Sequence, residues 1–288
     1  MPLPAVQYMI KEALQYQSPE IIIIDINGIT YCSQSFTETK SPAFTDTIKE
    51  GKIRDEAILD IYNGNRSWED DIPFIKYHKN IFRLDTCIAY ASYYQEFGNK
   101  ATILKGYTSN PTKVEDYSLT ELVDPSTITE YAVFTEYENE ISTKLLDYCD
   151  TIKDEVKIIF TRLPRLTIKN FNENEIPLIN SFVKMIEERG FDFVDFYYDM
   201  QNFNIDLSLD FNDETHLNIF GALKFTDYLC EYLIDNYSLS NGFIDEKWDT
   251  CVEYANQYFE DLKLSTINRE GKEFYELDLA KTYNVFGV

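Results

Sequence analysis

Three short apolar runs, each beside a segment with helical spacing, constrain the fold of this chain most strongly. They are Ile21–Ile26, Val156–Thr161 and Phe191–Phe196. The first run is continuous and β-branched, which is typical of a strand buried on both faces of a parallel sheet. Apolar side chains recur at helical spacing in residues 4–17, 137–152, 174–189 and from Asn218 to about Asp235.

This alternation of strands and helices predicts the fold class. Strand–helix–strand–helix order favours right-handed crossovers and an α/β domain, with a three-layer, doubly wound (flavodoxin-like) parallel sheet. We expect this domain to span residues 1–240, with a helical insertion over about 43–97 and a polar loop excursion over about 106–136. Residues 241–288 are expected to form a C-terminal appendage with a helix near Glu246–Leu262 and a hairpin within Ser265–Leu279.

Charge and cysteine content narrow the possible partners. The chain has 26 basic and 50 acidic residues and a net charge of -24, which argues against a nucleic-acid or anionic-membrane partner. Its 5 cysteines form no Cys-x-x-Cys or His/Cys cluster, so we expect neither a zinc site nor a disulfide framework, and no cofactor. No apolar run reaches transmembrane length, and the first residues lack a signal pattern.

The motif with the clearest chemical meaning is Asp213-x-x-His216, which precedes a strongly periodic helix. A carboxylate that holds an imidazole in one tautomer lets the histidine take a proton from a hydroxyl and return it to a leaving group. Two structural alternatives stay open. In the first, His216 is a structural residue that caps a loop. In the second, Asp213 is the N-cap of a turn ahead of the helix, and Asp206 or Asp210 orients the imidazole in its place. Of the two histidines, the other, His78, is expected to be a packed or surface residue.

Polar residues follow the predicted strands, where parallel α/β sheets bind their ligands. Asn27 and Gly28 follow the first strand and would either offer a backbone N–H to an oxyanion or form a turn. Arg162 and Arg165 follow the second and would either bind a carboxylate or phosphate of a substrate, or lie in a solvated loop or in ion pairs. Asn218 would be a helix N-cap or a substrate contact. The His216 turn is expected to open onto the same edge.

The block Asp213-x-x-His216-Leu-Asn218-x-x-Gly221-Ala, followed by Lys-Phe-Thr-x-Tyr-Leu, resembles the last conserved block of SGNH/GDSL-type hydrolases. It is most similar to the branch of anaerobic Gram-positive bacteria that includes relatives of cell-surface O-acetyltransferases and acylhydrolases. Two further stretches that begin at Tyr8 and at Pro73 fit the same branch. The resemblance covers roughly residues 4–262, and its specific part is the His216 block.

The resemblance implies a serine ester hydrolase or O-acyltransferase that acts on acetyl esters of a cell-surface glycan. His216 would be the base and then the acid, and Asp213 would orient it. The complete protein would be extracytoplasmic and membrane-anchored. An alternative is a catalytically inactive domain of this fold that binds carbohydrate or another partner, and a third is a plain structural domain.

One part of the family pattern is missing. The family's nucleophile lies in a Gly-x-Ser turn after a first strand, and none of the 10 glycines here precedes such a serine. Ser33 and Ser35 follow a strand, but at the position of the family's second strand. We therefore expect the nucleophile and the central first strand to lie upstream of this chain. The Ile21–Ile26 and Val156–Thr161 strands would then leave a gap or pair directly.

Overall fold

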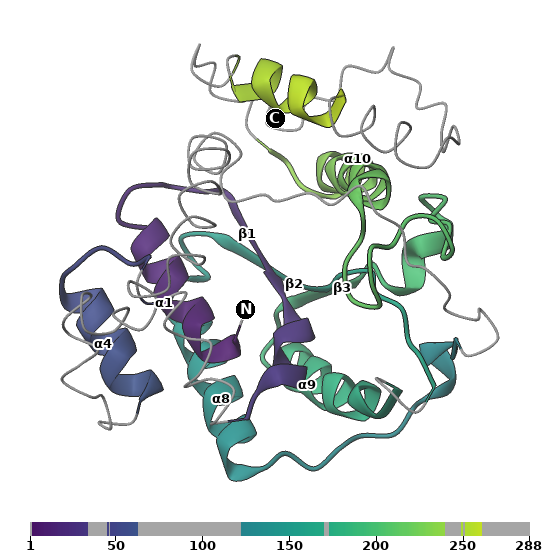
Figure 1. Ribbon diagram of the computed structural model, residues 1–288. Helices are drawn as coiled ribbons and strands as arrows, with labels where there is room; N and C mark the ends of the chain where they lie inside the picture. Colours follow the sequence, from purple (N-terminus) through teal and green to yellow (C-terminus); the bar gives the residue numbers. More distant parts are fainter. Residues whose placement is uncertain are drawn as a thin grey trace, which may run out of the picture. The chain divides into compact units, whose positions relative to one another are not determined.

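The computed structural model describes residues 2–33, 45, 47–62, 122–169, 173–239, 249 and 251–260 (Figure 1). The chain has an α/β fold with a small parallel sheet and several helices. It divides into two compact units, Met1–Ile72 with Glu121–Asp199, and Pro73–Thr120 with Met200–Val288. Most of the predicted insertion and excursion, and the predicted hairpin, lie outside the described residues.

The sheet consists of β1 (Ile21–Asp25), β2 (Lys157–Arg162) and β3 (Asp192–Asp195) in the order β1-β2-β3. All pairs are parallel. Each strand falls on a predicted apolar run and differs from it by no more than two residues at either end. Of the two arrangements that the sequence left open, β1 and β2 adopt direct pairing, with Ile23 opposite Ile159.

Four helices of the first unit are described. They are α1 (Leu3–Ala13), α4 (Lys52–Ile61), α8 (Glu136–Ile152) and α9 (Ile176–Glu188). The first unit also contains the short 3-10 segments η1 (Ile26–Tyr31), η4 (Pro125–Thr127), η5 (Glu173–Glu175) and η6 (Tyr198–Gln201, which ends across the unit boundary). The start of α8 is fixed by a capping box, in which Thr135 and Glu138 satisfy each other's backbone N–H groups.

One face of the sheet packs into the main core. Ile158 and Phe160 are two residues apart in β2 and therefore lie on this face. They share a cluster with buried residues of α1, α8 and α9. Phe160 packs edge-to-face against Phe182 and Phe191, with ring centroids 6.5 and 5.4 Å apart. Burying each such side chain contributes about 1.5–3 kcal/mol, so this face anchors the helices to the sheet.

The expectation that the first strand is buried on both faces is wrong. Ile24 is 3% exposed and lies in the core, whereas Ile23 on the opposite face is 37% exposed. Among the described strands β1 lies at the end of the sheet, and the main core of described residues covers the face of Ile22 and Ile24.

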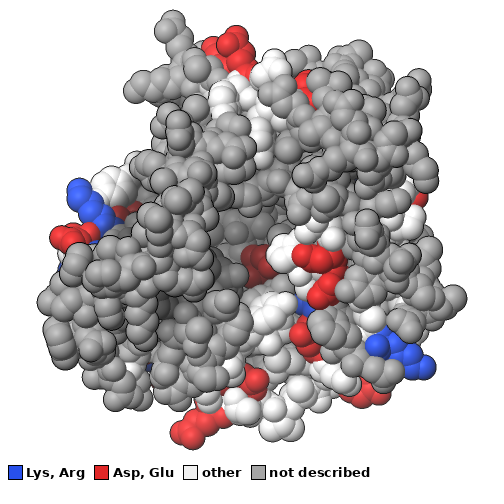
Figure 2. Space-filling view, in the orientation of Figure 1, with Lys and Arg blue, Asp and Glu red and all other residues white. Residues whose placement is uncertain are grey.

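In the second unit, a compact loop leads from Met200 to α10 (Ile219–Asn236). Residues 251–260 are helical, which agrees with the predicted helix near Glu246–Leu262. Within the described residues, no helix has the length and apolar character needed to span a membrane. On the face drawn in Figure 2, acidic side chains cover more of the described surface than basic ones, in line with the net charge of -24.

Candidate functional site

The Asp213 carboxylate organises the turn that carries His216. Its Oδ1 accepts hydrogen bonds from the backbone N–H of Thr215 at 2.8 Å and of His216 at 2.9 Å. The imidazole Nδ1 of His216 lies 2.9 Å from both Oδ1 and Oδ2. The turn-capping role and the imidazole-binding role of Asp213, which the sequence posed as alternatives, therefore coexist in one carboxylate.

The other two carboxylates that the sequence offered as partners for His216 are engaged elsewhere. Asp206 accepts the N–H and hydroxyl of Ser208 at 2.8 and 2.6 Å. Asp210 is fully buried and accepts a hydrogen bond from Lys224 Nζ at 2.7 Å. Asp213 is thus the residue that the structure pairs with the imidazole.

The loop around this pair is closed by backbone contacts. Phe211 and Leu217 form an antiparallel bridge, and the Asn212 N–H donates to the His216 carbonyl at 2.8 Å. The Asn218 N–H donates to the Asp210 carbonyl at 2.9 Å. These bonds hold Asp213 and His216 at the tip of a short hairpin-like loop.

Asn218 joins this loop to α10. Its Oδ1 accepts from the N–H groups of Phe220 and Gly221 at 3.0 and 3.1 Å, and its Nδ2 donates to the Leu209 carbonyl at 2.6 Å. The N-cap alternative is therefore what the structure contains. Because Asn218 is only 1% exposed, its side chain presents no surface to a substrate.

His216 itself faces solvent. Its side chain is 73% exposed, and Nε2 makes no hydrogen bond to any described residue. Burial raises the pKa of Asp213, but hydrogen bonds from Thr215 and His216 outweigh it and lower that pKa below its usual value. An ionised Asp213 accepts only, so Nδ1 is the donor and Nε2 carries the lone pair that a base needs.

The loops that follow β1 and β2 meet at the carboxyl end of the sheet. Asp25 Oδ1 accepts from the N–H groups of Asn27 and Leu163, each at 3.3 Å, and Asn27 Nδ2 donates to the Leu163 carbonyl at 3.3 Å. Asn27 and Gly28 lie in η1 rather than in a tight turn. The Asn27 N–H is already bonded to Asp25, which removes it as an oxyanion donor. Burial raises the pKa of Asp25.

Arg162 and Arg165 form ion pairs, as one of the alternatives for them expected, but these pairs lie in the interior and not in a solvated loop. The two residues are only 1% and 3% exposed, and each guanidinium can be buried because it forms an ion pair with a carboxylate. Arg162 donates from Nε and Nη2 to Asp195 at 3.1 and 2.6 Å and stacks over the rings of Tyr197 and Tyr198. Arg165 pairs with Glu175. Both charges are compensated inside the protein, which leaves neither as a free anion clamp.

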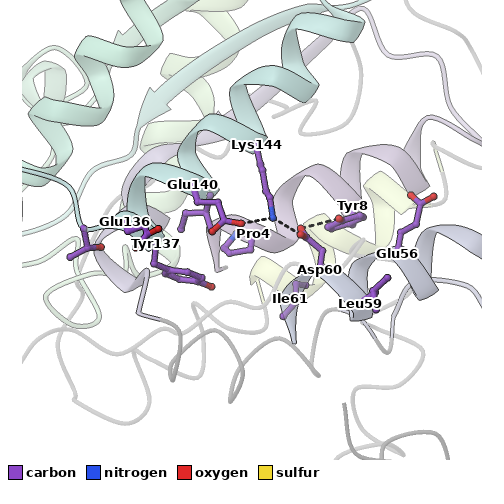
Figure 3. Close-up of a pocket in the computed structure, with 12 residues that line it drawn as sticks. Pro4, Tyr8, Glu56, Leu59, Asp60, Ile61, Glu136, Tyr137, Glu140 and Lys144 are labelled. Atoms are coloured by element: carbon purple, nitrogen blue, oxygen red, sulfur yellow. Dashed lines mark hydrogen bonds and ion pairs between the residues drawn. The ribbon is translucent and has the colours of Figure 1, made fainter. Parts of the chain in front are cut away.

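A second polar site, which the sequence did not reveal, lines a cavity of about 750 Å³ between α1, α4 and α8 (Figure 3). Tyr8 Oη donates to Asp60 Oδ2 at 3.0 Å, and Lys144 Nζ lies 2.6 Å from Asp60 Oδ1 and 2.8 Å from Glu140 Oε1. Burial and the Asp60 charge raise the pKa of Tyr8, so its hydroxyl stays protonated. Pro4, Ile61 and Ile141 contribute buried apolar side chains to its lining.

No sequence motif indicates this cavity, because Asp60 is 52 residues from Tyr8 and 84 from Lys144.

Within the described parts of the chain, no three His, Cys, Asp or Glu side chains are arranged to hold a metal ion. No protein-family model matches the sequence, and searches of curated proteins and of solved structures likewise return no match. That the His216 turn opens onto the carboxyl edge of the sheet stays a prediction.

Proposed function

We propose that the chain carries the acid–base pair of an SGNH/GDSL-like ester hydrolase or O-acyltransferase that acts on acetyl esters of a cell-surface glycan. The proposal includes the three-layer, doubly wound fold of that family. One observation carries it. The Asp213 carboxylate holds Nδ1 of His216 at 2.9 Å, while the imidazole is 73% exposed with Nε2 unbonded to described residues.

In the proposed reaction, Nε2 of His216 takes the proton of an attacking hydroxyl, and the hydroxyl oxygen bonds to the ester carbonyl carbon. Asp213 stabilises the imidazolium that forms, and Nε2 then returns the proton to the departing alcohol. The acyl group remains on the attacking oxygen until water or a sugar hydroxyl accepts it. In this proposal, the nucleophilic serine belongs to a segment outside the 288 residues.

In the test, methanol in solution provides the attacking hydroxyl in place of the serine. The chain is incubated with p-nitrophenyl acetate and a low concentration of methanol, and methyl acetate is measured by NMR. We expect methyl acetate formation above the uncatalysed rate, with loss of that excess in His216→Ala and a large reduction in Asp213→Asn. Equal rates for the wild type and His216→Ala would remove His216 from the chemistry. With a serine in place, the same histidine substitution should cost about 10³-fold or more.

A matched control concerns the nucleophile. Without methanol, the 288-residue chain should show no p-nitrophenol release that a serine-reactive phosphonate blocks, because water is then the hydroxyl that His216 activates. Turnover that a serine-reactive phosphonate blocks would show that a serine within the chain attacks the ester, and the proposal of an external nucleophile would then be wrong.

A second candidate function is a catalytically inactive, carbohydrate-binding domain. The cavity in Figure 3 favours it, because tyrosine rings, carboxylate acceptors and the Lys144 ammonium suit a ligand rich in hydroxyl groups. NMR titration with chitotetraose tests it. Binding that Asp60→Asn abolishes, together with no His216-dependent methyl acetate, would favour this second function over the first.

A further inference from the structure

The hydroxyl of Thr215 is a third oxygen group at the contact between Asp213 and His216. Its Oγ1 lies 3.0 Å from Asp213 Oδ1 and 3.0 Å from His216 Nδ1. The backbone N–H of Thr215 also donates to Oδ1, at 2.8 Å, so both the main chain and the side chain of this residue contact the carboxylate. Nδ1 of His216 therefore faces two carboxylate oxygens and one hydroxyl oxygen.

The hydroxyl is held more firmly than the ring that it contacts. The His216 side chain is 73% exposed, so packing contributes little to its orientation. Thr215 is half-buried, and its backbone is fixed by the N–H bond to Asp213. The β-branch of a threonine also restricts rotation about χ1, which keeps its hydroxyl in one place. Thr215 is thus a fixed neighbour for an imidazole that mostly faces water.

The single proton of this hydroxyl has two possible acceptors. They are Asp213 Oδ1 and, when the ring carries its own proton on Nε2, the lone pair on Nδ1 of His216. Hydrogen bonds lower the pKa of Asp213, so its carboxylate is ionised, and a hydrogen bond to an ionised acceptor is stronger than one to a neutral nitrogen. The hydroxyl proton therefore goes to Oδ1, and a lone pair of Oγ1 is left facing Nδ1.

This arrangement favours one tautomer of the imidazole. A ring protonated on Nδ1 donates into the group of oxygens around it. A ring protonated on Nε2 would place its Nδ1 lone pair against the lone pair of Oγ1, or would draw the hydroxyl proton away from Asp213. In both cases the Nε2–H form loses a hydrogen bond, which corresponds to about two- to tenfold in the ratio of the two tautomers.

We propose that Thr215 is a positioning residue for the acid–base pair, because its hydroxyl donates to Asp213 and its oxygen lone pair keeps the ring proton of His216 on Nδ1. The residue acts through Asp213 and His216 and does not itself take part in proton transfer to the ester. This inference rests on the proposed role of His216 as the base, and it assigns a function to a position that the Asp213-x-x-His216 motif leaves unspecified.

Thr215→Val tests the proposal, because valine keeps the β-branch and the backbone N–H and removes the hydroxyl. The tautomers of the neutral His216 ring are measured in ¹⁵N–¹H correlation spectra. We expect the ratio of the Nδ1–H form to the Nε2–H form to fall by about two- to tenfold and to recover in Thr215→Ser. An unchanged ratio would overturn the proposal. A shift toward the Nδ1–H form would also overturn it, since the hydroxyl would then donate to Nδ1 in the wild type.

Thr226→Val is the matched control. It makes the same change at a threonine whose hydroxyl donates to the Ala222 carbonyl at 2.8 Å within α10. This variant should leave the tautomer ratio of His216 at its wild-type value. An equal change in Thr226→Val and Thr215→Val would show that the ratio responds to any lost hydroxyl in this unit, and the specific role of Thr215 would then be wrong.

The methyl acetate assay separates this inference from the acyl-transfer function on which it rests. If the wild type forms methyl acetate through His216, Thr215→Val should lower the excess rate by about two- to tenfold, and Thr215→Ser should restore it. An excess rate that Thr215→Val leaves unchanged would overturn the positioning role. If the wild type forms no methyl acetate through His216, the acyl-transfer function fails, and the tautomer ratio alone decides whether Thr215 positions the imidazole.

Discussion

Gly221→Ala should destabilise the unit that contains α10, although alanine is the better helix former. A Cβ at position 221 would lie 2.3 Å from the Asp210 carbonyl oxygen, whereas ordinary contact begins at 3.4 Å. The obstacle is backbone and cannot rotate away, so α10 and the loop before it must separate by about 1 Å. That separation also strains the hydrogen bond from the Asn218 N–H to the same oxygen.

The magnitude follows from two opposing effects. Helix propensity favours the substitution by about 1 kcal/mol, and overpacking of a close contact costs about 1–3 kcal/mol, with backbone clashes at the upper end. We expect a net loss of about 1–2 kcal/mol, measured from native-state hydrogen exchange of the α10 amides in urea. Ala222→Gly is the matched control, because it should lose only about 1 kcal/mol of propensity. A Gly221→Ala protein as stable as the wild type would refute the reasoning.

Three further predictions concern single side chains. Asn218→Ala should cost about 1–2 kcal/mol of stability through loss of the N-cap, and Asn218→Asp should recover only part of that loss, because a carboxylate keeps the cap acceptor but cannot donate to the Leu209 carbonyl; an Asn218→Ala protein as stable as the wild type would argue against capping. Lys224→Met should cost about 3–5 kcal/mol by leaving the buried Asp210 carboxylate without its ammonium, and adding Asp210→Asn should recover most of that loss in urea unfolding, because the amide is neutral and its oxygen can still accept from the Asp206 N–H. Burial raises the pKa of Asp25, so its carboxyl stabilises the fold in acid, and this contribution is lost as the pH rises through the folded-state pKa. Asp25→Asn should therefore gain stability relative to the wild type above about pH 4, and parallel urea midpoints across the pH range would contradict this.

The elements that the sequence predicted correctly depend on local patterns. The β-branched run at Ile21 and the helical spacing after Asn218 each specify an element within one short stretch. The Asp213–His216 contact was also predictable, because a separation of three residues lets one tight turn join the two side chains. In all these cases the determining residues are neighbours in the sequence.

What the sequence could not supply depends on distant partners. Nothing near Arg162 indicates that Asp195, 33 residues later, will neutralise it and allow its burial. The Tyr8–Asp60–Lys144 network likewise joins three helices with no shared motif. Ile23 is exposed in a strand that lies at the end of the described sheet, a position that residue composition alone does not determine.

The tautomer of the neutral His216 imidazole tests the acid–base assignment most directly, and ¹⁵N–¹H correlation spectra report it. The account predicts that Nδ1 carries the proton and Nε2 the lone pair, because Asp213 accepts from Nδ1. In Asp213→Asn this preference should weaken. A ring protonated mainly on Nε2 in the wild type, or an unchanged tautomer in Asp213→Asn, would contradict the claim that Asp213 prepares His216 to act as a base.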